Sequence, residues 1–186
     1  MSFSSSEADF TITCGDVSFE VKLDEKCMAK SVSSMLIEPF VSGYNKRNGT
    51  KMTVYNVFNI AVGGEPLPQS VKDVLAYPAR TLSGGPSTQI TLELIEAAHV
   101  SVSAGETHTE VSLATKFLKG SVGDSLVGPF LSYYNKANGT KMKKSNVKGL
   151  VFDGETPMEA LASILKMHTH AIIKDPRKTE IRVLLG

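Results

Sequence analysis

The sequence predicts an α+β fold that is built twice, as two consecutive domains of about 90 residues each. Residues 31–57 return as residues 121–147 without a gap, and 16 of the 27 positions are identical. Alternating apolar runs, typical of half-buried strands, come before this segment in both copies, and an apolar stripe of helical period lies inside it. We therefore expect one domain in residues 1–95 and a second in residues 96–186.

Each copy begins with a predicted β-hairpin. In the first copy Phe10, Ile12 and Cys14 alternate with polar residues, and a second alternating run covers residues 17–23. Gly15-Asp16 lies between the runs and has the composition of a tight turn. The second copy repeats this pattern with Val100, Val102, Gly105-Glu106, Val111 and Leu113.

A helix is predicted next, inside the repeated segment. Apolar residues spaced by four form its stripe: Val32, Leu36, Phe40 and Tyr44, with Val122, Leu126, Phe130 and Tyr134 in the second copy. Ser31 is a suitable N-cap, and Asn48-Gly49 suits the left-handed end of a helix.

A proline interrupts this helix in both copies, as Pro39 and Pro129. Proline in a helix interior removes a hydrogen bond and kinks the helix. Two arrangements follow from this: a bent helix, or a short turn followed by a helix that starts at the proline.

The rest of each copy predicts a third strand, a glycine turn, a short helical piece and a last strand. The third strands are residues 57–62 and 147–152, and the last strands are residues 90–94 and 181–185. The short helix is clearest in residues 157–165. The predicted order is β-β-α-β-(short α)-β, in a mixed sheet packed on one helix, with the strongly apolar last strand at its centre.

This order of elements resembles the ubiquitin-like β-grasp. The likeness is sharpest at Leu150-Val-Phe-Asp-Gly154-Glu, which is similar to the third strand and following turn of ubiquitin-like domains. Thr179-Glu-Ile-Arg-Val-Leu-Leu-Gly186 is similar to their last strand. The proline and the long connection 48–56 depart from the usual pattern. The resemblance implies two tandem ubiquitin-like domains.

The junction between the copies is short. Glu96-Ala97-Ala98 contains neither glycine nor proline, and few residues separate the last strand of one copy from the first strand of the next. We therefore expect a stiff connection that couples the two domains rigidly.

Composition excludes several classes of protein. The chain is 41% hydrophobic and 21% charged, as in ordinary globular proteins, and no apolar run approaches the roughly 20 residues of a membrane span. Residues 1–95 carry 8 basic and 10 acidic side chains, and residues 96–186 carry 12 and 9, so neither half has the charge of a nucleic-acid-binding protein. The first residues have no secretion signal, which indicates a cytoplasmic location.

No pattern in the chain indicates catalysis, a metal or a cofactor. There is no phosphate-binding loop, dinucleotide fingerprint or nucleophile elbow. His168 and His170 could offer two metal ligands, but no third ligand has zinc-site spacing around them. Cys14 and Cys27 are absent from the second copy, so we expect reduced, buried thiols without a catalytic role. The sequence thus predicts a protein that is not an enzyme.

The predicted binding surface is the outer face of the sheet of the second copy. If Leu150 and Phe152 point toward the helix, Val151 points outward, and the alternation of the last strand turns Arg182 and Leu184 outward beside it. The first copy has Ala61, Thr91 and Glu93 at the matching places. Ubiquitin-like domains commonly bind partners through this face, so the resemblance implies a protein-binding patch here.

A run of lysines follows the helix of the second copy. It consists of Lys136, Lys141, Lys143, Lys144 and Lys148, whereas the first copy has only Lys46, Arg47 and Lys51 in the same stretch. Lysines without interleaved aromatic residues favour an acidic protein surface over stacked bases.

The function predicted first is a non-enzymatic adaptor or structural module that binds other proteins. Tandem modules similar to doublecortin repeats bind microtubules, so a cytoskeletal association is one variant of this prediction, although the chain lacks their strong basicity. A second alternative is a ubiquitin-like modifier, or its precursor, that uses the C-terminal Gly186. A third is an enzyme with a site at the domain junction, where His99, His168 or His170 would act.

Overall fold

The computed structural model describes residues 7–186 and divides the chain into two compact units, the first ending at Ile95 and the second beginning at Glu96. Each unit has its own mixed β-sheet and few helices, which confirms the α+β class. The expected absence of a secretion signal concerns a segment whose first six residues lie outside the described residues. Within residues 7–186, no helix is long and apolar enough to cross a membrane.

The first unit holds a five-stranded sheet in the order β2-β1-β5-β3-β4. Its elements, in chain order, are β1 (Ala8–Cys14), β2 (Val17–Leu23), α1 (Glu25–Met28), the π-helical turn η1 (Ser33–Ile37), α2 (Glu38–Asn48), η2 (Val54–Asn56), β3 (Val57–Val62), β4 (Glu65–Pro66), α3 (Val71–Ala76), η3 (Ala79–Leu82) and β5 (Ser87–Leu94).

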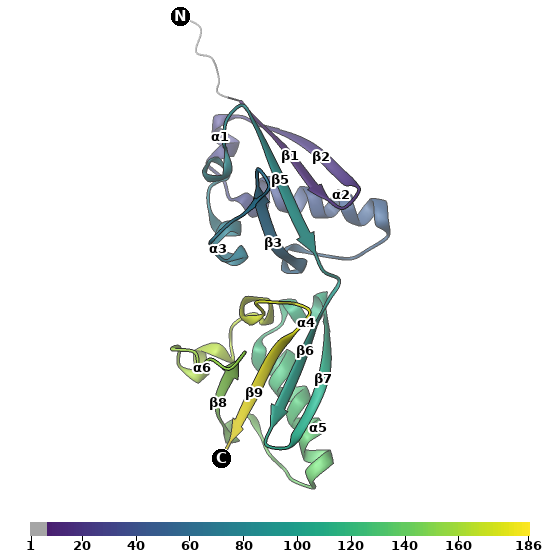
Figure 1. Cartoon of the computed structure of the whole chain (residues 1–186), viewed down its shortest axis with the longest axis vertical. Helices are drawn as coiled ribbons and strands as arrows, with labels where there is room; N and C mark the ends of the chain where they lie inside the picture. Colours follow the sequence, from purple (N-terminus) through teal and green to yellow (C-terminus); the bar gives the residue numbers. More distant parts are fainter. Residues whose placement is uncertain (1–6) are drawn as a thin grey trace, which may run out of the picture. The chain divides into compact units, whose positions relative to one another are not determined.

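The last strand of the first unit occupies the centre of the sheet, as the sequence predicts. β5 pairs in parallel with β1 and antiparallel with β3, while β1 pairs antiparallel with β2. The β1–β2 hairpin turns at Gly15, whose positive φ of 58° is accessible to glycine without steric cost. The main helix α2 lies across one face of this sheet (Figure 1).

The second unit repeats this arrangement in a four-stranded sheet with the order β7-β6-β9-β8. Its elements are β6 (Ala97–Ala104), β7 (Thr107–Ala114), α4 (Thr115–Lys119), the π-helical turn η4 (Gly123–Val127), α5 (Gly128–Asn138), η5 (Lys144–Asn146), β8 (Val147–Phe152), α6 (Leu161–Ile164), η6 (Thr169–Ile172) and β9 (Thr179–Leu185). The predicted short helix over residues 157–165 is confined to α6.

The proline that both copies contain is accommodated by a change of helix type. Ahead of it the chain forms one π-helical turn, in which the backbone N–H of Glu38 reaches back five residues to the C=O of Ser33. Pro39 then lies in the first turn of α2, where its missing N–H is tolerated. The structure therefore resembles the second predicted arrangement, with a π turn before the α-helix.

The predicted cap of this region is present in both units. The side chain of Ser31 accepts a hydrogen bond from the backbone N–H of Ser34 at 3.2 Å, and Ser121 does the same for Asp124 at 3.2 Å. At the other end, Gly49 and Gly139 take the left-handed conformation with φ of 67° and 64°. These residues recur in both copies because they begin and end the same helical segment.

One asparagine in each unit fastens the connection that follows the main helix. Asn45 Oδ1 accepts hydrogen bonds from the Thr50 hydroxyl at 2.7 Å and from the Met52 backbone N–H at 2.9 Å. Its Nδ2 donates to the Met52 C=O at 2.8 Å. Asn135 makes the same three bonds to Thr140 and Met142. The repeated sequence of this connection is thus explained by one shared hydrogen-bond pattern.

A second asparagine holds the end of the last strand in each unit. In the first unit the Asn56 side chain is fully buried and donates from Nδ2 to the C=O of Ile95 at 2.8 Å, while the Ile95 N–H donates to the Asn56 C=O at 2.9 Å. In the second unit, the C=O of Asn146 accepts a hydrogen bond from the backbone N–H of Gly186 at 3.0 Å. This pairing fixes the third strand beside the last one.

One difference between the copies is the position of a large aromatic side chain between the second strand and the main helix. In the first unit the Phe19 ring packs edge-on against Phe40, with centroids 5.5 Å apart, and covers Gly43 so closely that a Cβ there would lie 2.6 Å from it. The second unit has Thr109 and Tyr133 at the two matching positions. The large side chain is therefore on the strand in one copy and on the helix in the other.

We predict that Asn45→Ala lowers the free energy of unfolding of the first unit by about 2–3 kcal/mol, because the Met52 backbone groups lose their partners in a partly buried site. Urea unfolding followed through NMR signals of the first unit measures this. Asn48→Ala is the matched control, since Asn48 makes one exposed bond to the Tyr44 C=O and its loss costs about 0.5–1 kcal/mol. Equal effects of the two substitutions would contradict the assigned role.

Candidate protein-binding surface

The two apolar residues of the predicted sheet-face patch differ in how far they are exposed to solvent. Val151 is only 5% exposed, whereas Leu184 is 40% exposed. In the register of β8 and β9, Val151 lies opposite Arg182, and Leu184 lies opposite Gly149. Val151 therefore lies on the outer face of the sheet but contributes almost no exposed apolar surface there.

The reason is the set of long and polar side chains around Val151. Val151 lines a depression of about 250 Å³ together with Ser101, Ser103, Glu180 and Arg182, which all lie on the outer face of the sheet. Directly opposed cross-strand residues have Cβ atoms about 5 Å apart. Val151 therefore lies among side chains of the neighbouring strands, with Arg182 directly opposite, and little of it reaches solvent. The resulting surface is polar, with Leu184 as its exposed apolar residue.

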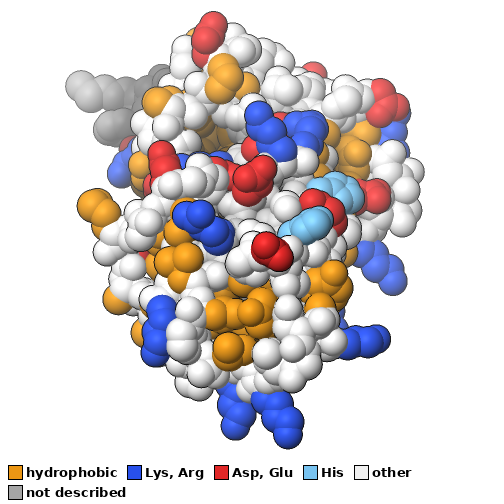
Figure 2. Space-filling view, turned by 60° about the horizontal axis from the view of Figure 1, so that its bottom comes forward, with side chains coloured by type: hydrophobic (Ala, Val, Ile, Leu, Met, Phe, Trp, Pro, Cys, Tyr) orange, Lys and Arg blue, Asp and Glu red, His pale blue; other side chains and the backbone are white. Residues whose placement is uncertain are grey.

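The lysines lie on several consecutive elements of the second unit. Lys141 is in the connection after α5, Lys143 and Lys144 are at the start of η5, and Lys148 is on β8; all four are exposed. Figure 2 shows Lys and Arg side chains that project separately at the lower edge of the view, beside a group of hydrophobic side chains.

Two of these lysines contact the scaffold. Lys144 Nζ donates a hydrogen bond to the carboxylate of Asp124 in η4, and this bond lowers the pKa of the Asp124 carboxyl. The stem of Lys148 lies against Gly186, where a Cβ would approach it to 2.9 Å. Lys144 thus forms an exposed ion pair with a residue of the π-helical turn.

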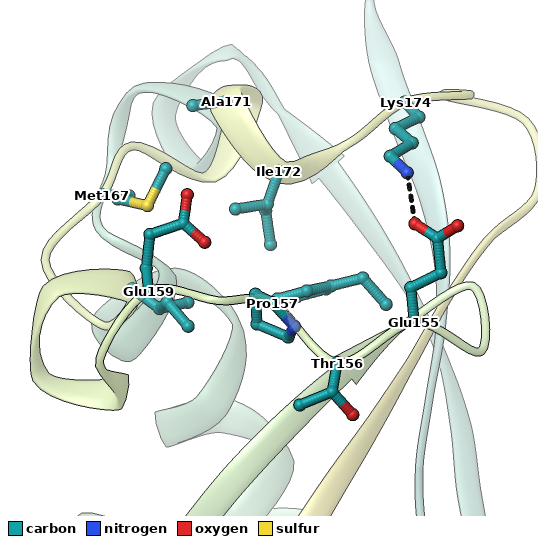
Figure 3. A pocket seen from close by; sticks show the side chains of 10 residues that line it. Glu155, Thr156, Pro157, Glu159, Met167, Ala171, Ile172 and Lys174 are labelled. Atoms are coloured by element: carbon teal, nitrogen blue, oxygen red, sulfur yellow. Dashed lines mark hydrogen bonds and ion pairs between the residues drawn. The ribbon is translucent and has the colours of Figure 1, made fainter.

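The second unit also has an open apolar pocket that the sequence did not reveal. Its volume is about 240 Å³. Three parts of the unit surround it: the end of β8, the segment that contains α6, and η6 (Figure 3). Its apolar lining residues are Phe152, Pro157, Ile164, Met167, Ala171 and Ile172. Met158 follows Pro157 in the chain and is fully exposed, at 102%. Exposed apolar surface of this kind is typical of sites that bind other molecules.

The rim of the pocket carries charge. Lys174 Nζ donates to Glu155 Oε2 at 2.9 Å, and this bond lowers the pKa of Glu155 and raises the pKa of Lys174. In Figure 3 this pair stands on one side of Pro157 and Ile172, and Glu159 stands on the other. No ion pair between Glu159 and another residue of the described chain is found. The rim is therefore acidic on the side of Glu159.

The first unit has a different set of residues at the matching places. Val62 replaces Phe152, Gln69 replaces Glu159, Tyr77 replaces Met167 and Gly84 replaces Lys174. The ion pair and the acidic side of the rim therefore belong to the second unit. Sequence reasoning missed this site because its lining comes from segments whose apolar residues read as ordinary core and turn positions. The consecutive Pro157-Met158-Glu159, with a large apolar residue in a turn, was the available signal.

The remaining candidate residues lie on separate elements. His99 is exposed on β6, His168 is exposed just ahead of η6, and His170 is buried within η6. Cys14 and Cys27 are free thiols and are half-buried rather than fully buried as expected. Among residues 7–186, no three His, Cys, Asp or Glu side chains are grouped so that they could hold a metal ion.

Gly186 is engaged by the scaffold. Besides its backbone bond to Asn146, its C=O accepts a hydrogen bond from Asn146 Nδ2 at 3.4 Å. The equivalent residue of the first unit, Ile95, is held by Asn56 in the same way. In this structure Gly186 is therefore held beside Asn146 and continues the pairing of β9.

Neither a protein-family model nor a curated protein matches the chain.

We predict that Val151→Asp lowers the free energy of unfolding of the second unit by about 3 kcal/mol, because a nearly buried apolar side chain is lost and the new carboxylate is desolvated, a cost that the opposite Arg182 offsets only in part. Leu184→Asp, on the same face but exposed, is the control and changes stability by no more than about 1 kcal/mol. Urea unfolding followed through second-unit signals gives both values. If Val151→Asp is as mild as Leu184→Asp, the corrected description of this face is wrong.

Proposed function

We propose that this chain is a non-enzymatic adaptor that binds other proteins, built from two ubiquitin-like, β-grasp domains covering residues 1–95 and 96–186. Support for the β-grasp comes from the sheets: the first and last strands of each unit are parallel central neighbours, and each forms an antiparallel pair with the next strand outward. Further support is the single main helix that lies across one face of each sheet (Figure 1). Such a fold carries many functions, so the binding role needs its own observation.

The observation that carries the binding role is the apolar pocket of the second unit. It combines an open apolar interior of about 240 Å³, a charged rim and the fully exposed Met158 next to it. Protein interfaces are centred on apolar anchors that enter such pockets and are surrounded by polar groups. The second unit is therefore the proposed binding unit, as the differences between the copies already suggested, but through the pocket rather than through Val151.

The outer sheet face is the second proposed contact region, with a smaller share of the binding. Leu184 and Arg182 are exposed on this face and Lys148 is exposed on β8, while Lys141 and Lys143 are exposed in the connection that leads to β8. Arg182 and these lysines suit an acidic partner surface and act on association rate more than on affinity, because exposed charges are screened by salt.

We predict that a photo-crosslinking amino acid at position 158 of the full chain forms discrete adducts with proteins in a native lysate. The reason is that Met158 stands in solvent beside the pocket, within reach of any partner that enters it. The same amino acid at position 68, the matching place in the first unit, is the control. Adducts are detected by gel electrophoresis and identified by mass spectrometry.

Ala171→Met, which extends a side chain into the pocket, should reduce the adducts from position 158 by at least about fivefold. The adducts from position 68 should be unchanged. Identical adduct patterns at the two positions, or no adducts at either, would contradict the proposed function.

A further inference from the structure

The size of the pocket in the second unit restricts what can enter it. Its volume of about 240 Å³ exceeds the roughly 150 Å³ of an apolar cavity that accommodates one benzene molecule. It is below the roughly 300–1,000 Å³ of pockets that bury drug-sized ligands. A single side chain of a partner, presented from a chain that runs across the rim, matches this size.

The chemistry of the walls selects an aliphatic side chain. Phe152, Ile164, Met167 and Ile172 line the interior, and the thioether of Met167 adapts readily to the shape of its neighbours. The polar lining residues, Glu155, Thr156, Glu159 and Lys174, belong to the rim and are exposed. A polar side chain inside the pocket would lose its hydration without gaining a partner, whereas an aliphatic one gains the free energy of burial.

The charges of the rim select what stands next to that side chain. The Glu155 carboxylate is already neutralised by Lys174 at 2.9 Å. Glu159 stands on the other side of Pro157 and Ile172 and has no ion-pair partner within residues 7–186 (Figure 3). A carboxylate at the edge of an apolar site favours a neighbouring cation and disfavours a neighbouring anion.

We infer that the pocket binds a protein segment in which an aliphatic side chain the size of leucine is adjacent to a lysine or arginine. The aliphatic side chain enters between Phe152, Met167 and Ile172, and the basic residue pairs with Glu159. This inference rests on the proposed protein-binding function and adds the chemistry of the partner. The first unit, which has Gln69 in place of Glu159 and Tyr77 in place of Met167, does not share this preference.

The test uses the full chain, labelled with ¹⁵N, and three capped seven-residue peptides that differ at two places. Their central residues are Arg-Leu, Asp-Leu and Arg-Ser, between the same glycine and serine residues. We expect the Arg-Leu peptide to shift the amide signals of Met167, Ala171 and Ile172 in a saturable way. The Arg-Ser peptide binds at least about tenfold more weakly because no apolar side chain is buried. The Asp-Leu peptide binds more weakly than the Arg-Leu peptide, by no more than about threefold.

Two variants separate the parts of the inference. Glu159→Arg, at an exposed position, should reverse the order of the Arg-Leu and Asp-Leu peptides, while Gln69→Arg in the first unit should leave it unchanged. Ala171→Met should abolish the shifts by filling the pocket, and the dispersion of its spectrum shows whether the unit is still folded.

Saturable shifts that map to the outer sheet face around Leu184 would overturn the pocket inference and leave the protein-binding function intact. Crosslinked partners that persist when Ala171→Met fills the pocket would likewise overturn the pocket inference and leave the protein-binding function intact. An unchanged peptide order in Glu159→Arg would overturn the basic preference. No saturable shift with any of the peptides at several millimolar would overturn the inference as a whole.

Discussion

The side chain of one asparagine in each unit joins the end of the main helix to the strand that follows. Asn45 and Asn135 use both ends of the amide group, so that a connection of polar residues is held without regular secondary structure. The third strand begins a few residues later, and its place beside the last strand depends on where this connection ends. Without these bonds, a helix ending in a left-handed glycine would lead into a loop with no fixed course. The position of the third strand in turn sets the walls of the pocket, because Phe152 is the last residue of β8.

Much of the fold could be predicted because local patterns and tertiary packing agree. The alternation of β1 and β2, the period-four stripe of the main helix and the third strands were readable, since one face of each element is buried. Pro39 predicts either a bent helix or a turn before a new helix. The π-helical form of that turn could not be predicted, because proline alone does not determine which carbonyl group the Glu38 N–H reaches. Burial of Val151 was missed for a similar reason. Alternation gives the face on which a side chain lies, but not how much of it the side chains of neighbouring strands bury.

The pocket was not predictable from the same patterns, although it belongs to the unit that the comparison of copies favoured. Its walls come from the end of β8, from α6 and from η6. These elements meet because the chain turns back after β8. Each residue taken alone reads as core or loop. The residues shared between the copies carry the scaffold: the capping serines, the proline, the asparagines and the glycine ends. The residues that differ are therefore where a function specific to the second unit has to lie, and the pocket and its rim consist mostly of such residues.

The most direct test of this division is to move the pocket to the other scaffold. Residues 152–174 are placed in the full chain instead of residues 62–84, a segment of equal length that leaves both asparagine connections untouched. The number of binding sites for a peptide with a central Arg-Leu is then measured by titration. If the shared residues are the scaffold and the departures from them are the site, the transplanted chain binds two peptides where the original binds one. A folded first unit that leaves the stoichiometry at one would contradict this account.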